Sequence, residues 1–228
     1  MTAVILAAGI ASRLRPLTDH TPKCLLEIGG RSILPRAMEA LRAEGLTRFV
    51  IVTGYLREQI EAQVGALWPG LDVTFVHNAD YASTNNIHSL WLAREAAGER
   101  GMLLLDSDIL FHRGIVRALL DAPHANCLAL SAAHPVGEEE IKVQLDGDHR
   151  VRAISKTVAV ADAAGESIGI ERFSADFTAA LFDEVDTMIL REGQSGVFYE
   201  RAFERLIARG FSLHAVDISR FPCMELDT

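Results

Sequence analysis

The sequence predicts an α/β domain with a mixed, mainly parallel sheet flanked by helices. Continuous apolar runs at 3–8, 48–53 and 102–105 are typical of strands that are buried on both faces of a sheet. Stretches with helical character lie between them, at about 33–44 and 56–67. Strands that alternate with helices in this way form parallel sheets covered by helices on both faces.

The remaining elements of the first half continue the alternation. Ser32 is placed to cap the first helix and Gly45 to end it. A strand is expected at 73–77, followed by a polar, turn-rich stretch. The further helices of this half are expected at about 87–97 and 113–120.

The pattern changes after residue 126, where short strands replace the regular alternation. Asp146-Gly147-Asp148 is typical of a hairpin turn. There is no internal repeat and no linker, so we expect one domain, 1–228, with halves 1–125 and 126–228. The expected strands are 127–131, 141–145, 151–155, 168–173 and 211–216, and the expected helices are 174–191 and 196–208.

Composition restricts the class of protein. The formal net charge of −9 argues against broad binding to nucleic acid or to an anionic membrane. The three cysteines are widely spaced, which favours reduced thiols over a disulfide framework. The apolar run 3–8 is too short for a signal peptide or a membrane span. We therefore expect a soluble, cytoplasmic protein with no nucleic-acid or membrane partner, and the sequence leaves room for a homodimer.

A polar loop follows the first strand and carries the residues for binding phosphate. A loop at the carboxyl end of a sheet strand is where α/β folds bind ligands, and small residues let backbone N–H groups approach phosphate oxygens. Arg13 offers a planar fork of donors and Lys23 a compact charge. The glycine and prolines could instead only shape turns, but the ordered set of residue types favours a triphosphate site. The residues expected to contact the nucleotide here are Leu6, Ala7, Ala8, Gly9, Ala11 and Ser12.

The order of these residues resembles the signature of the nucleoside-triphosphate transferase family, the GT-A-like nucleotidyltransferases. That signature reads Gly-x-Gly-x-Arg-x-x-Pro-x-Thr-x-x-x-Pro-Lys, and the chain follows it from Gly9 to Lys23 except that Ala11 replaces the second glycine. The resemblance implies a Rossmann-like GT-A fold and an enzyme that transfers a nucleoside monophosphate. It also implies that Arg13 and Lys23 bind and activate the phosphates as catalytic residues.

An acidic pair follows the third buried strand. Asp106 and Asp108 come directly after a run of leucines, and carboxylate oxygens suit Mg²⁺, which usually also binds phosphates and water. Asp108 could instead cap the next helix. The resemblance implies a further aspartate near the C-terminus, which matches Asp227. We therefore expect a Mg²⁺ cofactor on Asp106, Asp108 and Asp227.

Two asparagines open the helix at 87–97. Amide side chains both donate and accept hydrogen bonds, so they can bind a base edge, although asparagine also caps helices well. The stretch 85–90 resembles the Asn-Asn-Ile-x-Ser-Leu segment of phosphocholine and aminoethylphosphonate cytidylyltransferases. The resemblance implies cytidine as the base, with uridine and adenine open as alternatives. The residues expected here are Asn85, Asn86 and Ser89.

Three segments of the second half follow one another in order, at 141–143, 152–156 and 167–171. They resemble the acceptor side of the same cytidylyltransferases and of their inositol-phosphate relative. The resemblance implies that Lys156 and Lys142 hold the acceptor phosphate, Lys156 as a catalytic residue, and that Gly169 and Glu171 contact the acceptor. Lysines on a hairpin are also often simply exposed. Aromatic residues make up only 7% of the chain, so a cage for choline is not evident. A primary amine, a phosphorylated amide or a polyol phosphate fits the acidic residues equally well.

We therefore expect a nucleotidyltransferase that transfers CMP from CTP to a small phosphorylated or phosphonylated acceptor and releases pyrophosphate. Residues 1–125 would form the nucleotide-binding half and residues 126–228 the acceptor-binding half. One alternative is a sugar-1-phosphate nucleotidyltransferase of the same fold, and another is a non-catalytic nucleotide-binding module. A dehydrogenase is not favoured, because the loop lacks the dinucleotide-binding glycine pattern, as it lacks the P-loop pattern.

Overall fold

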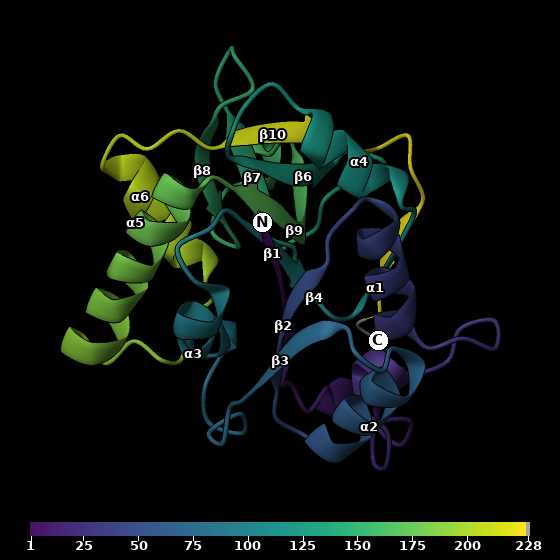
Figure 1. Ribbon diagram of the computed structural model, residues 1–228. Coiled ribbons are helices and arrows are strands. Elements are labelled where there is room, and N and C mark those ends of the chain that lie inside the picture. Colours follow the sequence, from purple (N-terminus) through teal and green to yellow (C-terminus); the bar gives the residue numbers. More distant parts are fainter. Residues whose placement is uncertain (227–228) are drawn as a thin grey trace.

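The computed structural model describes residues 1–226 and has a central nine-stranded mixed sheet (Figure 1). Seven strands form its main path in the order β10-β6-β9-β4-β1-β2-β3, and β7 and β8 pair beside β9. The strands of this sheet are β1 (Thr2–Ala7), β2 (Arg48–Thr53), β3 (Asp72–His77), β4 (Met102–Asp106), β6 (Cys127–Ser131), β7 (Lys142–Leu145), β8 (Val151–Ser155), β9 (Gly165–Phe173) and β10 (His214–Asp217).

The direction of the strands divides the sheet. β1 pairs in parallel with β2 and β4, and β2 pairs in parallel with β3. β9 lies antiparallel between β4 and β6, so a strand from late in the chain sits in the middle of the sheet. The prediction of a mixed, mainly parallel sheet flanked by helices is confirmed.

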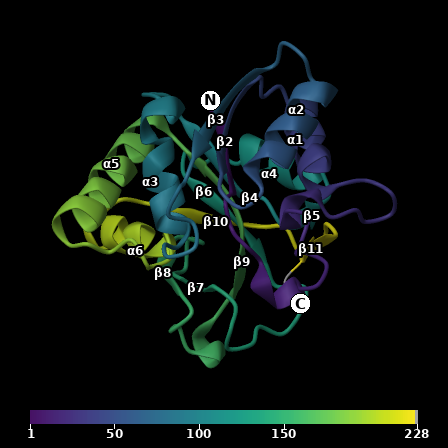
Figure 2. The same cartoon turned by 90° about the horizontal axis from the view of Figure 1, so that it is seen from below.

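Helices cover both faces of the sheet (Figures 1 and 2). α3, α5 and α6 pack on one face, and α1, α2 and α4 lie on the other, so the sheet separates two hydrophobic cores. Within residues 1–226, no helix is both long and apolar enough to cross a membrane. The helices are α1 (Ile33–Ala43), α2 (Arg57–Leu67), α3 (Asn86–Ala97), α4 (Gly114–Asp121), α5 (Ala175–Asp186) and α6 (Glu200–Ala208).

The alternation of side chains along each central strand produces the two cores. On β1, Val4 enters the core under α3, whereas Ile5 enters the core under α1. β4 repeats this pattern with Leu104 and Leu105. Successive side chains of a strand point to opposite faces, so a strand that is buried on both faces needs an unbroken apolar run. This explains the runs in the sequence.

The structure differs from the expected elements mainly in the second half. The helix expected at 174–191 is α-helical only to Asp186 and ends in a π-helical turn, Thr187–Arg191. α6 begins at Glu200, not at 196, and the last strand of the large sheet begins at His214, not at 211. A two-stranded sheet of β5 (Ile109–Phe111) and β11 (Cys223–Glu225) was not expected, because three-residue strands are too short to show a period.

Candidate active site

A cavity of about 710 Å³ lies at the carboxyl ends of β1 and β4. The N-terminus of α3, the first half of β9, the start of α6 and β11 also contribute to its wall, as does the residue that follows β8. The cavity brings together most of the residues selected from the sequence, although they come from distant segments of the chain. Those that line it are Leu6, Ala7, Ala8, Gly9, Ala11, Arg13, Lys23, Asn85, Asn86, Ser89, Asp106, Asp108, Lys156 and Gly169.

The phosphate loop leaves β1 and turns sharply at Ala11. This residue has a φ of 52°, in the left-handed region that glycine favours, which agrees with the glycine of the signature. Its carbonyl oxygen accepts hydrogen bonds from the Leu14 N–H at 3.0 Å and the Thr18 hydroxyl at 2.9 Å, and these hold the turn. A Cβ atom at Gly9 would meet no protein atom within 4 Å, so protein packing does not require glycine there. The space in front of the Gly9 backbone is therefore available to a ligand.

Lys23 connects the phosphate loop to the acidic segment after β4. Its Nζ atom donates a hydrogen bond of 2.7 Å to Asp108 Oδ2, and both side chains are largely buried. The other carboxylate oxygen of Asp108, Oδ1, is buried and has no hydrogen-bond partner within residues 1–226. A buried carboxylate oxygen without a donor is costly and fits a bound cation.

Asp106 is the last residue of β4, the strand between β1 and β9, and it lines the cavity. The Tyr199 hydroxyl donates a hydrogen bond of 2.9 Å to Asp106 Oδ2 and fixes the carboxyl group. Gly169 faces the same carboxyl group with a φ of +69°, and a Cβ atom there would lie 2.6 Å from Asp106 Oδ2. Glycine is therefore required at 169 both by its backbone conformation and by the close approach of Asp106.

Several carboxyl groups gather around Asp106. Burial, followed by the nearby charges of Asp108, Glu200 and Glu225, raises the pKa of Asp106 well above its usual range. Burial raises the pKa of Glu200 to about 7, and burial with the charge of Asp106 raises that of Glu171. Such crowding favours the binding of a cation. Within residues 1–226, however, no three Asp, Glu, His or Cys side chains are arranged to hold a metal ion by themselves.

The two asparagines lie where α3 meets the loop before α6. Asn85 caps α3, because its side-chain oxygen accepts from the Asn86 N–H at 2.8 Å. The Asn86 side-chain oxygen accepts from the Tyr199 N–H at 2.9 Å, and the Asn85 N–H donates to the Ser195 carbonyl oxygen at 2.9 Å. Both side-chain oxygens thus have protein partners, and the amide NH₂ groups are the donors that these residues can offer to a base.

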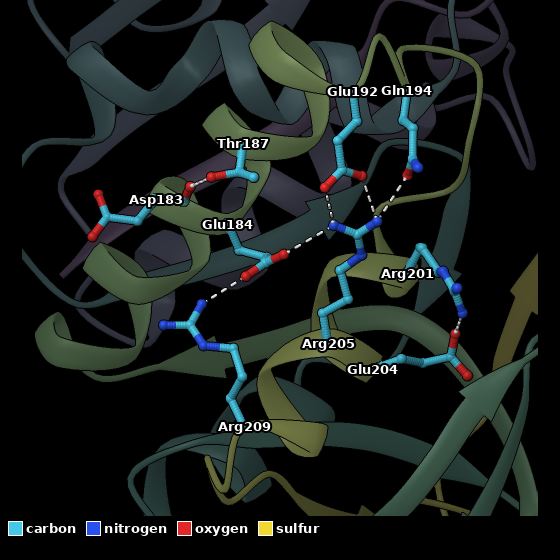
Figure 3. Close-up of polar contacts among 9 residues, drawn as sticks. All are labelled: Asp183, Glu184, Thr187, Glu192, Gln194, Arg201, Glu204, Arg205 and Arg209. Carbon is cyan, nitrogen blue, oxygen red and sulfur yellow. Dashed lines mark hydrogen bonds and ion pairs between the residues drawn. The ribbon is translucent and has the colours of Figure 1, made fainter.

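An ion-pair network holds the loop before α6 in place (Figure 3). The guanidinium of Arg205 on α6 donates to Glu192 at 2.6 and 3.0 Å, to Glu184 on α5 at 3.2 Å and to Gln194 at 3.4 Å. Arg209, one turn later, donates to the same Glu184 at 2.6 Å. The network ties the two ends of the loop together, and the loop carries the groups that contact the asparagines.

The two lysines expected at the acceptor have different positions. Lys156 lines the cavity, where its Nζ atom lies 3.4 Å from Glu139 Oε2 and 5.1 Å from the centre of the Phe198 ring. Lys142 is fully buried outside the cavity wall. Its Nζ atom donates to the backbone carbonyl oxygens of residues 137, 138 and 140, at 3.3, 2.8 and 3.3 Å. This position does not support an acceptor contact for Lys142, because its ammonium group is used to fold the 137–140 loop.

Two further expected residues do not contribute to the cavity wall. Ser12 does not line the cavity, and the carboxyl group of Glu171 is fully buried behind it, where the Ser167 hydroxyl donates to it at 3.4 Å. Asp227 lies outside the described residues. Glu225, two residues earlier, does line the cavity. The strand that carries it, β11, lies beside β5 (Figure 2), and their antiparallel pairing places Glu225 opposite Ile109.

Sequence reasoning missed several residues of the cavity wall. Glu200 and Phe198 lie at and just before the start of α6, and only the tertiary fold brings them to the cavity. Asn78 is buried after β3 and donates from its amide to the Ser89 hydroxyl at 3.1 Å, which positions that hydroxyl. A lone polar residue after a strand carries no pattern by which it could have been found.

Comparison with known proteins identifies the family. Residues 3–199 match the model of the MobA-like NTP transferase domain. The chain is 29% identical over 99% of its length to CMP-5'-(3-aminopropyl)phosphonate synthase of Streptomyces rubellomurinus, but spans only 36% of that protein. It is 25% identical over its whole length to CTP:phosphoglutamine cytidylyltransferase of Campylobacter jejuni and covers 96% of it.

A solved structure supports the same assignment at the level of the fold. The inositol-1-phosphate CTP transferase from T. maritima superposes on the whole chain with a TM-score of 0.83 at 18% identity, and the chain covers 90% of it. The family match spans both the phosphate loop and Asp106, which is where the structure places the cavity. The chain therefore belongs to the MobA-like NTP transferase domain family.

Proposed function

We propose that this protein transfers CMP from CTP to a small phosphorylated or phosphonylated acceptor and releases pyrophosphate. The observation that carries the proposal is the single cavity that joins the phosphate loop, Asp106 and the Asn85–Asn86 pair. The names of the two relatives, a CMP-phosphonate synthase and a CTP-using cytidylyltransferase, support CTP and an acceptor of this kind. Residues 1–125 would supply most of the nucleotide site and residues 126–228 most of the acceptor site.

The chemistry needs no protein nucleophile. An oxygen of the acceptor phosphate or phosphonate attacks the α-phosphorus of CTP in line, a new P–O bond forms, and the bond to the β-phosphate oxygen breaks. Arg13 and Lys23 bind the phosphate oxygens and neutralise the charge that develops on the departing pyrophosphate. Lys156 holds the attacking group against the α-phosphorus, so that positioning supplies much of the rate.

We infer that Mg²⁺ completes this site, held by Asp106 and Asp108 together with Asp227. The unpartnered Oδ1 of Asp108 and the crowded, buried carboxyl of Asp106 fit a hard cation. When bound, the metal supplies positive charge next to the phosphate groups. Lys23 then has a second role, because its pair with Asp108 orients the carboxylate.

The test is pyrophosphate release by the purified protein with each NTP and a panel of acceptors: aminoalkyl phosphonates, phosphocholine, a polyol phosphate and glucose 1-phosphate. CTP with a non-sugar acceptor should give the fastest release. Lys23→Ala and Asp106→Asn should each lower the rate by roughly 100-fold or more, whereas Arg31→Ala, which removes an exposed charge paired with Glu39, should not. Absence of release with every combination would exclude the proposed function, and preference for glucose 1-phosphate would favour a sugar nucleotidyltransferase.

A further inference from the structure

Glu200 is a buried carboxylate for which the reaction described above has no use. It occupies the first turn of α6, is only 5% exposed, and lines the cavity. Its Oε2 atom is buried and has no hydrogen-bond partner within residues 1–226. Buried polar atoms in proteins are nearly always hydrogen-bonded, so an unpaired carboxylate oxygen on a residue that lines a cavity indicates a missing partner.

The two lysines that line the cavity do not satisfy this oxygen of Glu200. The charge of Lys156 opposes the rise that burial causes in the pKa of Glu200, but the ammonium group is hydrogen-bonded to Glu139 and lies over the Phe198 ring. Lys23 is paired with Asp108. Because no donor among residues 1–226 satisfies Oε2, a bound ligand that donates a hydrogen bond fits this position, and a positively charged donor also compensates the charge of the carboxylate.

We propose that Glu200 binds a primary ammonium group of the acceptor, which makes the acceptor a short aminoalkyl phosphonate or aminoalkyl phosphate. This inference rests on the proposed function and identifies the substrate class of that same site. The phosphonate end would face Lys156 and the α-phosphorus, and the ammonium end would face α6. The spacer between them is short, because Glu200 and Lys156 line the same cavity.

The same geometry disfavours a quaternary ammonium group. A trimethylammonium has no N–H and cannot satisfy the unpaired oxygen of Glu200, and it prefers a cage of aromatic rings. Within the described structure, the phenyl and phenol rings on the cavity wall are those of Phe198 and Tyr81. The face of Phe198 is covered by Lys156, and Tyr81 packs beside Ala8 and Gly54 on the nucleotide side. No cage surrounds Glu200 among residues 1–226.

The wild-type protein and three acceptors of the same length test the proposal. Pyrophosphate release is measured with CTP and 2-aminoethylphosphonate, its N,N,N-trimethyl derivative or propylphosphonate, which lacks the nitrogen. The kcat/KM for the primary amine should exceed that for each of the other two by about 30-fold or more, as expected for a buried, hydrogen-bonded charge pair.

Two variants then assign the preference to Glu200. Glu200→Gln keeps the shape but not the charge, and should reduce the preference for the primary amine to within about threefold, mainly through KM. Glu204→Gln is the matched control, because it removes a carboxylate one turn along the same helix, where Glu204 pairs with Arg201. It should keep the full preference, and near-ultraviolet circular dichroism verifies that both variants fold.

The outcomes separate this inference from the proposed function. Equal use of the three acceptors, or preference for the trimethyl compound, overturns the inference and leaves the cytidylyltransferase function standing. If the Glu200→Gln variant is active and keeps the full preference for the primary amine, the assignment of this preference to Glu200 is overturned. No release with any NTP and any acceptor overturns both. If Glu200→Gln does not fold, the wild-type acceptor series still decides the substrate class.

Discussion

A single methyl group at position 169 is expected to disrupt the site. In Gly169→Ala, the new Cβ would lie 2.6 Å from Asp106 Oδ2, and alanine would have to adopt a φ of +69°. Pyrophosphate release should fall by roughly 100-fold or more, and the free energy of unfolding by about 1–3 kcal/mol. Steady-state kinetics and urea denaturation measure the two effects. Gly65→Ala in α2, where a Cβ has open space, is the control and should be neutral or slightly stabilising.

At position 11, replacement of alanine by glycine is expected to stabilise the protein. Ala11 holds a left-handed conformation that costs a non-glycine residue about 1–2 kcal/mol, and glycine removes that strain at the expense of about 0.5–1 kcal/mol of chain entropy. Ala11→Gly should therefore raise the free energy of unfolding by up to about 1 kcal/mol, measured by urea denaturation. A clear loss of stability would show that the Cβ of Ala11 has a packing role.

At the scale of elements, Arg205 joins α5, α6 and the loop between them (Figure 3). Arg205→Ala removes bonds to two carboxylates and one amide, and should lower the free energy of unfolding by about 1 kcal/mol after allowance for solvent screening. It should also raise the KM for CTP, because the loop contacts Asn85 and Asn86. Arg201→Ala on the same helix removes one exposed pair and should change neither value appreciably.

A stacked pair of histidines, one of them on β10, should make the stability of the protein depend on pH. The rings of His124 and His214 lie 3.6 Å apart and nearly parallel, and burial, with the charge of His124, lowers the pKa of His214. Asp146 and Asp148 oppose this shift, and Arg150 adds to it.

Because the folded state then binds fewer protons than the unfolded state, stability should fall as pH drops through and below the ordinary histidine value of about 6.5. His214→Phe keeps the stacking and should reduce this dependence in urea titrations at pH 7.5 and 5.5. An unchanged slope would assign the dependence to other groups.

At the scale of the whole molecule, ligand binding should stabilise the entire sheet. The cavity wall includes residues of β1, β4, β9 and β11, so unfolding must release the nucleotide. At CTP–Mg²⁺ concentrations of about 100 times Kd, the free energy of unfolding should rise by about 2.7 kcal/mol, which a thermal melt detects. EDTA should cancel the gain, and Asp106→Asn should show little of it. A gain that survives EDTA would contradict the metal assignment.

The fold could be predicted largely because it depends on local patterns. The runs at 3–8 and 102–105 are unbroken since both faces of β1 and β4 are buried. β5 and β11 could not be predicted, because each is three residues long and owes its existence to a partner more than 100 positions away.

In the site, too, residues that belong to local motifs could be predicted, whereas residues placed by distant contacts could not. Arg13, Lys23 and Asp106 belong to contiguous motifs next to a strand, and the cavity contains them. Glu200 has no local pattern that marks it, since only the crossing of α6 over the sheet brings it near Asp106. Lys142 shows the converse, because sequence reveals an ammonium group but not the three carbonyl groups that surround it.

Because β9 is central in the sheet but late in the chain, its position affects folding during synthesis. Until residues 165–173 have been synthesised, the edge of β4 next to Met102, Leu103 and Leu104 has no partner. An unpaired, apolar strand edge can pair with other chains, so the nascent chain is prone to aggregation until β9 has been synthesised. A gene fragment that encodes only residues 1–125 should accordingly accumulate in inclusion bodies. Co-expression with residues 126–228 would then be the route to soluble protein, because that piece carries the missing central strand.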